Sequence, residues 1–106
     1  LIAMGDAPDK PDPQGFIYLA RKLSKDKLGS SNVPIAYIGD TIADVQTVLN
    51  ARKKIPSQKF ISIGIAPPHL HLEGRKKERV LYESKLKDTG ADLILNSVNE
   101  LININL

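Results

Sequence analysis

Two acidic residues at the end of a predicted strand are the first candidates for chemistry. Asp40 follows the apolar run 35–38 and Gly39, and Asp44 comes four residues later. If a helix begins here, residues four apart lie on one face, so both carboxylates can serve one ligand. Magnesium prefers oxygen ligands and is often held by one or two carboxylates together with water. A simpler interpretation stays open, in which Asp40 or Thr41 caps the helix and Asp44 favours its dipole.

A lysine next to a proline-rich turn is the second candidate. Lys10 is followed by Pro11, Asp12 and Pro13. The two prolines restrict the backbone, so Lys10 should leave the chain in a fixed direction. A lysine ammonium is a compact charge that suits a phosphate or carboxylate partner, and at ~4 Å and an effective dielectric near ~20 such a pair is worth about 4 kcal/mol before desolvation. Taken alone, Lys10 is more simply a solvated lysine beside a helix start.

The two segments occur together, and further residues extend the pattern. Lys-Pro-Asp-Pro precedes an amphipathic helix, and Tyr-Ile-Gly-Asp-Thr-x-x-Asp closes the next strand. Other matching positions are Asn50 and Ala51 at the end of the second helix, Gly64, the run 90–95, and Glu100 with Leu101. This joint pattern covers nearly the whole chain and resembles the haloacid dehalogenase superfamily.

The resemblance implies a role for each matching residue. Lys10 corresponds to the lysine that neutralises the nucleophilic aspartate and the phosphoryl group. Asp40 corresponds to the magnesium ligand, and Asp44 to the second acid, which supports the metal directly or through water. The implied catalytic residues are therefore Lys10, Asp40 and Asp44, with Mg²⁺ as cofactor. Thr41 is a candidate phosphate contact through its hydroxyl, although helix capping accounts for it equally well.

The family's nucleophile lies in an earlier Asp-x-Asp segment, which these 106 residues do not contain. We therefore expect the chain to be the C-terminal portion of a core domain, inactive alone. The full-length protein is expected to hydrolyse a small phosphorylated substrate through an aspartyl-phosphate. A noncatalytic domain that binds magnesium or phosphate remains the alternative, and a dehalogenase acting on a carbon–halogen bond also stays open.

Strands and helices must alternate to position these residues. Unbroken apolar runs suit strands that are buried on both faces. Strands are expected at 35–38, 60–65 and 92–95, after a first apolar run at 1–4. The first helix is expected to have Asp12 as its N-cap and Pro13 as its first residue and to end at Gly29. A second helix is expected from Ile42 to about Lys54, and a short one after Ser97. A further helix is expected over 75–88, with a thin apolar face made of Val80, Leu81 and Leu86.

This alternation predicts one domain, residues 1–106, with a Rossmann-like, doubly wound parallel α/β sheet and flanking helices. Ligands of such sheets bind at the carboxyl ends of the strands, where the loops 5–13 and 39–44 lie. The resemblance places the nucleophile-bearing strand beside residues 35–38. Without that strand we expect an exposed apolar edge, covered by the remainder of the polypeptide or by a second protomer.

The amino-acid composition limits the classes of partner that the chain could bind. The chain is 42% hydrophobic and 25% charged, as in ordinary globular domains. A net charge of +3 and 5% aromatic residues do not favour nucleic acid, although a basic nucleic-acid-binding domain is a third alternative. No apolar run approaches the roughly 18 residues that span a membrane. The absence of cysteine excludes disulfides and fits a cytoplasmic location.

Two weaker groups complete the candidates. His69, His71 and Glu73 are possible zinc ligands, but three adjacent ligands without a fourth read more simply as an exposed loop. The three tyrosines are predicted to be partly buried packing residues: Tyr18, Tyr37 and Tyr82.

Overall fold

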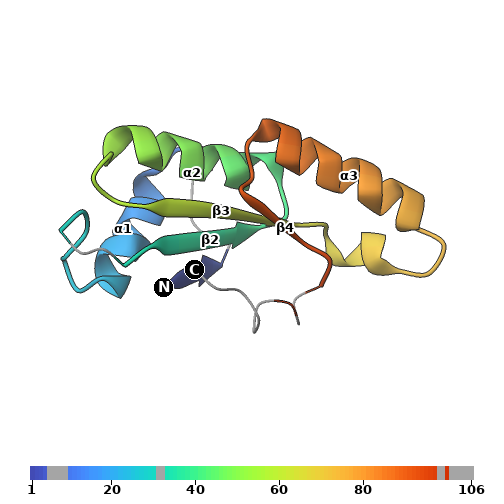
Figure 1. The fold of residues 1–106 in the computed structure, drawn as a ribbon, viewed down its shortest axis with the longest axis horizontal. Helices are drawn as coiled ribbons and strands as arrows, with labels where there is room; N and C mark the ends of the chain where they lie inside the picture. The colour runs from blue at the N-terminus through green and yellow to red at the C-terminus, as the bar shows by residue number, and fades with distance from the viewer. Residues whose placement is uncertain (5–9, 31–32, 98–99, 101–106) are drawn as a thin grey trace.

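The predicted alternation of strands and helices is present in the computed structural model, which describes residues 1–4, 10–30, 33–97 and 100. Its strands form one parallel sheet with the order β1-β2-β3-β4 (Figure 1). The architecture is therefore α/β and compatible with a Rossmann-like fold. The elements are β1 (Ile2–Met4), α1 (Gln14–Leu23), β2 (Ile35–Gly39), α2 (Ile42–Lys54), β3 (Phe60–Ile65), the 3-10 helix η1 (Pro68–His71), α3 (Lys76–Thr89) and β4 (Leu93–Leu95).

All α-helices of the described residues pack on one face of the sheet. Tyr37 and Phe60 belong to the cluster that contains α1 and α2 residues. A Cβ built on Gly64 would lie 3.1 Å from Leu86 of α3. Tyr37 and Gly39 point to the same side of β2, and Gly39 pairs with Gly64, so the three helices share that side. Figure 1 shows α2 and α3 running along the same side of the strands.

The doubly wound arrangement expected from the sequence is therefore wrong for the described part of the chain. A doubly wound sheet needs a reversal in strand order, whereas here the spatial order follows the chain order. Because parallel crossovers are right-handed, steps that all move in one direction place every helix on the same side. The opposite face carries a second buried cluster, made of Ala36, Ile38, Ile63 and Leu95.

Aromatic packing fixes α1 against the sheet. Phe16 and Ala20 lie one turn apart on α1, and both are completely buried. The Phe16 ring lies 4.6 Å from the Tyr37 ring and 5.1 Å from the Phe60 ring, both in tilted geometry. Such pairs add to the burial of apolar area, so α1 is held over β2 and β3. Residues 10–13, which precede α1, are thereby placed near the carboxyl ends of the strands.

The edge of β2 is covered by the chain itself. β1 pairs with β2 in parallel, with Ile2 opposite Ala36 and Met4 opposite Ile38. The backbone N–H of Ala36 also donates to the carbonyl of Leu1 at 2.8 Å. The expected exposed edge at residues 35–38 is therefore wrong, because β1 occupies the position that the resemblance gives to the nucleophile-bearing strand.

The bounds of α1 differ from the predicted ones at both ends. The helix starts at Gln14, with Pro13 preceding it, and the Asp12 carboxylate accepts a hydrogen bond from the Gln14 N–H at 2.9 Å. The helix ends at Leu23, before the predicted Gly29. The reason lies in the turn that follows Ser24, where Lys25 and Asp26 both have positive φ values, which a helix cannot contain.

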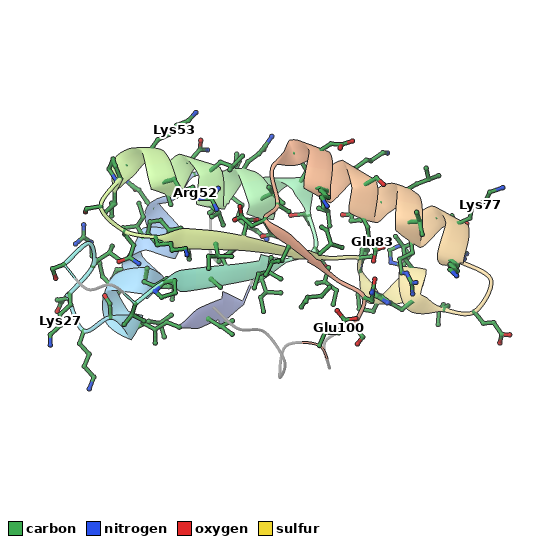
Figure 2. The ribbon with its side chains drawn as sticks, viewed as in Figure 1. Lys27, Arg52, Lys53, Lys77, Glu83 and Glu100 are labelled. Carbon is green, nitrogen blue, oxygen red and sulfur yellow. The ribbon has the colours of Figure 1, made fainter. Side chains whose placement is uncertain are left out.

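The buried face of α3 is not the predicted one. Leu86 is buried as expected, but Val80 and Leu81 are 47% and 64% exposed. Tyr82, one turn before Leu86, packs against the same cluster instead. Figure 2 shows Lys77 projecting from the outer end of α3 and Glu83 on its inner side. The short helix predicted after Ser97 falls largely on residues outside the described part of the chain.

Candidate functional site at the end of strand β2

The first turn of α2 forms a capping box. The Thr41 hydroxyl accepts a hydrogen bond from the Asp44 N–H at 3.1 Å, and the Asp44 carboxylate accepts one from the Thr41 N–H at 3.1 Å. Two N–H groups that a helix start leaves without intrahelical partners are satisfied in this way. The interpretation that Thr41 caps the helix is therefore confirmed, and Asp44 lies in the first turn as predicted. It does not explain the remaining contacts of Asp44, which reach well beyond the helix.

The Asp44 carboxylate is the centre of the site. It is only 2% exposed, although it belongs to an acidic residue. Besides the Thr41 N–H, one oxygen accepts hydrogen bonds from the Asp40 N–H at 3.1 Å and from the Thr41 hydroxyl at 2.8 Å. The other oxygen accepts from the Tyr37 hydroxyl at 3.3 Å and faces the Lys10 ammonium. A buried carboxylate needs such partners, because desolvation without them is costly.

Lys10 and Asp44 form an ion pair across the carboxyl end of β2. The ammonium nitrogen lies 2.7 Å from Asp44 Oδ1, and the Lys10 side chain is 25% exposed. The Asn50 side-chain amide holds the lysine loop by donating to the Pro11 carbonyl at 3.1 Å. The structure therefore brings together two of the three residues to which the resemblance gives catalytic roles. The pair is partly screened by water on the lysine side, so its attraction is less than that of a fully buried pair.

Asp40 lies beside this pair with its backbone fully engaged. Its N–H donates to Asp44, and its carbonyl accepts a hydrogen bond from the Tyr82 hydroxyl. Within the described residues, no hydrogen bond or ion pair reaches the Asp40 carboxylate. The residue is half-buried. Of the two predicted metal ligands, Asp40 is thus the carboxylate to which no residue of the described ranges donates a hydrogen bond.

Tyr82 is a member of the site that the sequence did not reveal, because it was assigned to packing. Its ring is half-buried at the α2–α3 contact, and its hydroxyl reaches a backbone carbonyl 42 residues earlier in the chain. Burial raises the pKa of the Tyr82 phenol above 10.0, and the negative charges of Asp40 and then Asp44 raise it further. The hydroxyl therefore stays protonated, and able to donate, throughout the neutral range. The other two tyrosines were also predicted to be partly buried, but Tyr37 is almost completely buried and Tyr18 is 59% exposed.

The described residues contain no group of three or more histidine, aspartate or glutamate side chains that could hold a metal ion. A nitrogen of the His71 ring lies 2.8 Å from the Ala66 carbonyl, within its own loop. The donor set at β2 suits a cation that takes few protein ligands, as magnesium does. Asp40 can supply one oxygen ligand, and Asp44 can orient its neighbours.

Comparisons with protein-family models, curated proteins and solved structures found no match to this chain. In the part of the chain that the structure describes, no helix combines the length and the apolar character that crossing a membrane requires. The geometry at the end of β2, together with the sequence pattern, is therefore the basis of the functional proposal.

Proposed function

We propose that this chain is the C-terminal portion of the core domain of a magnesium-dependent phosphohydrolase of the haloacid dehalogenase type. In the full-length protein, the nucleophile-bearing strand would take the place beside β2 that β1 occupies here. The observation that carries the proposal is the Lys10–Asp44 ion pair at 2.7 Å, in which Asp44 also accepts a hydrogen bond from the backbone N–H of Asp40. A lysine and a buried acid that lie more than 30 residues apart in the chain meet at the carboxyl end of a parallel strand. Ligands of open α/β sheets bind at such ends.

Each residue has a distinct task in this proposal. Lys10 places a positive charge where a phosphoryl group would lie, and it offsets the charge that develops during transfer. Asp44 holds the ammonium in place, and it also holds the N–H groups of Asp40 and Thr41. Asp40 contributes a carboxylate oxygen to Mg²⁺, which when bound supplies further neutralisation of the phosphate. The Thr41 hydroxyl is already engaged by Asp44, so we assign it to the cap rather than to the phosphate.

The hydrogen bonding of Asp44 keeps a second candidate function in view. Both of its carboxylate oxygens have partners inside the protein, so direct metal binding by Asp44 would require Lys10 or Tyr37 to give way. A domain that binds magnesium or phosphate without turnover needs only Asp40 and Lys10. Hydrolysis of p-nitrophenyl phosphate by the full-length polypeptide, lost in Asp40→Asn, would distinguish the enzyme from the binding domain.

Magnesium binding by the chain itself tests the shared part of both functions. In an NMR titration with MgCl₂, the amide signals of Asp40 and Thr41 should shift in a saturable manner. Asp40→Asn should weaken the affinity at least about tenfold, because losing a ligand costs no less than losing an outer-shell partner. The matched control is Asp88→Asn, which removes an exposed aspartate on α3 and should leave the titration unchanged. Equal affinities of wild type and Asp40→Asn would reject the proposed site.

A further inference from the structure

The helix α3 contributes one polar group to the end of β2. The Tyr82 hydroxyl donates a hydrogen bond to the backbone carbonyl of Asp40. The rest of the tyrosine packs against a cluster that includes Val45 of α2 and Leu86 of α3. Leu86 is fully buried and lies one turn after Tyr82 on the same face of α3. The packing of α3 therefore determines where the Tyr82 hydroxyl lies.

Three hydrogen bonds fix the two peptide groups around Asp40. Its own N–H and the next N–H, that of Thr41, both donate to Asp44 at 3.1 Å. The carbonyl between them accepts from Tyr82. Asp44 therefore holds this segment from the α2 side and Tyr82 holds it from the α3 side. With both peptide planes fixed, the Cα–Cβ bond of Asp40 points in one direction.

We infer that Tyr82 is a positioning residue, which holds the Asp40 backbone so that its carboxylate is presented to a divalent cation. This inference rests on the proposed function and adds a residue to its metal site. Loss of the hydroxyl leaves the Asp40 carbonyl without its donor and allows the peptide group to rotate. The carboxylate then has to be ordered when the cation binds, and the affinity falls.

Tyr82→Phe is the test, because phenylalanine keeps the ring in the α2–α3 contact and removes only the hydroxyl. In metal-free protein, the Asp40 and Thr41 amides should exchange with solvent faster than in wild type. The affinity for MgCl₂, followed by NMR, should fall about three- to tenfold, the range expected for one hydrogen bond. Tyr18→Phe is the matched control: the Tyr18 ring is 59% exposed on α1 and lies under the Lys22 ammonium. It should change neither quantity.

The outcomes separate the inference from the proposed function. Wild type that binds Mg²⁺ while Tyr82→Phe binds it equally well overturns the positioning role and leaves the proposed function standing. The same conclusion holds if amide exchange rises but the affinity does not, since Tyr82 is then a packing residue with a local hydrogen bond. Wild type that shows no response to Mg²⁺ overturns the proposed function and the inference together.

Discussion

Replacing Asp44 by alanine should lower the free energy of unfolding by about 3–5 kcal/mol, the largest effect expected of any single substitution at the site. The side chain is 2% exposed, and its removal takes away one acceptor from each of several groups: the Lys10 ammonium, the Tyr37 and Thr41 hydroxyls, and the N–H groups of Asp40 and Thr41. Some of these can reach water through the opening at Lys10, which is 25% exposed. The net cost is therefore smaller than the sum of the separate bonds.

Urea unfolding followed by circular dichroism gives the measurement. A domain of this size has a total stability of about 5–15 kcal/mol, so the loss expected in Asp44→Ala is a large fraction of it. Asp44→Asn keeps the shape of the side chain and should be destabilised less, which provides a folded variant for comparison. The control is Asp88→Ala on the exposed side of α3, expected to stay within about 0.5 kcal/mol of wild type. A loss below about 1 kcal/mol in Asp44→Ala would contradict the described network.

The second large effect is expected at Gly39, the last residue of β2. A Cβ at this position would lie well inside van der Waals contact with the Asp44 side chain. The clash includes the Cβ of a buried side chain and not only its end, so Asp44 has to leave the position in which it pairs with Lys10. We expect Gly39→Ala to cost about 3 kcal/mol, as in overpacked sites, and to weaken magnesium binding as well.

Gly74→Ala is the informative comparison for Gly39→Ala. A Cβ on Gly74 meets nothing within 4 Å, but the residue has φ +85. Its substitution should cost about 1 kcal/mol through backbone strain alone and leave magnesium binding intact. Thermal and urea unfolding of both variants separate steric from conformational causes. Equal losses in the two variants, with magnesium binding unchanged in both, would mean that the close approach of Gly39 and Asp44 does not matter.

The local elements could be predicted because their signals are local. The unbroken apolar run at 35–38 became β2, which is buried throughout, and the run at 60–65 became β3. The helix cap at Thr41 could also be predicted, because a capping box depends only on two residues three positions apart, here Thr41 and Asp44. The burial period and the cap chemistry of a segment depend mainly on its own residues.

The arrangement of the elements could not be predicted in the same way. The pairing of β1 with β2 joins residues that are more than 30 positions apart in the chain. An apolar run of three residues, such as β1, does not indicate which strand it pairs with. The same holds for the face on which each helix packs, because it is set by strand order. An expectation taken from the resemblance left the edge of β2 open, whereas the chain closes it with β1.

The charged residues of the candidate site could be predicted from the sequence. Asp44 was singled out by residue type and spacing and Lys10 by the resemblance, and the two side chains meet as an ion pair. Tyr82 was missed, because a hydroxyl that donates to a backbone carbonyl 42 residues away leaves no pattern in either segment. A backbone carbonyl accepts hydrogen bonds whatever its side chain, so only the packing of α3 against α2 could reveal this contact.

The central claim is that Asp40 and the Lys10–Asp44 pair form one magnesium site at the carboxyl end of β2. A crystal structure grown with MgCl₂ tests it most directly. The account predicts a Mg²⁺ ion at about 2.1 Å from an Asp40 carboxylate oxygen, with waters completing its coordination and the Lys10 ammonium still beside Asp44. A structure in which the ion is absent from Asp40, or in which the Lys10 ammonium points away from both acids, would contradict it.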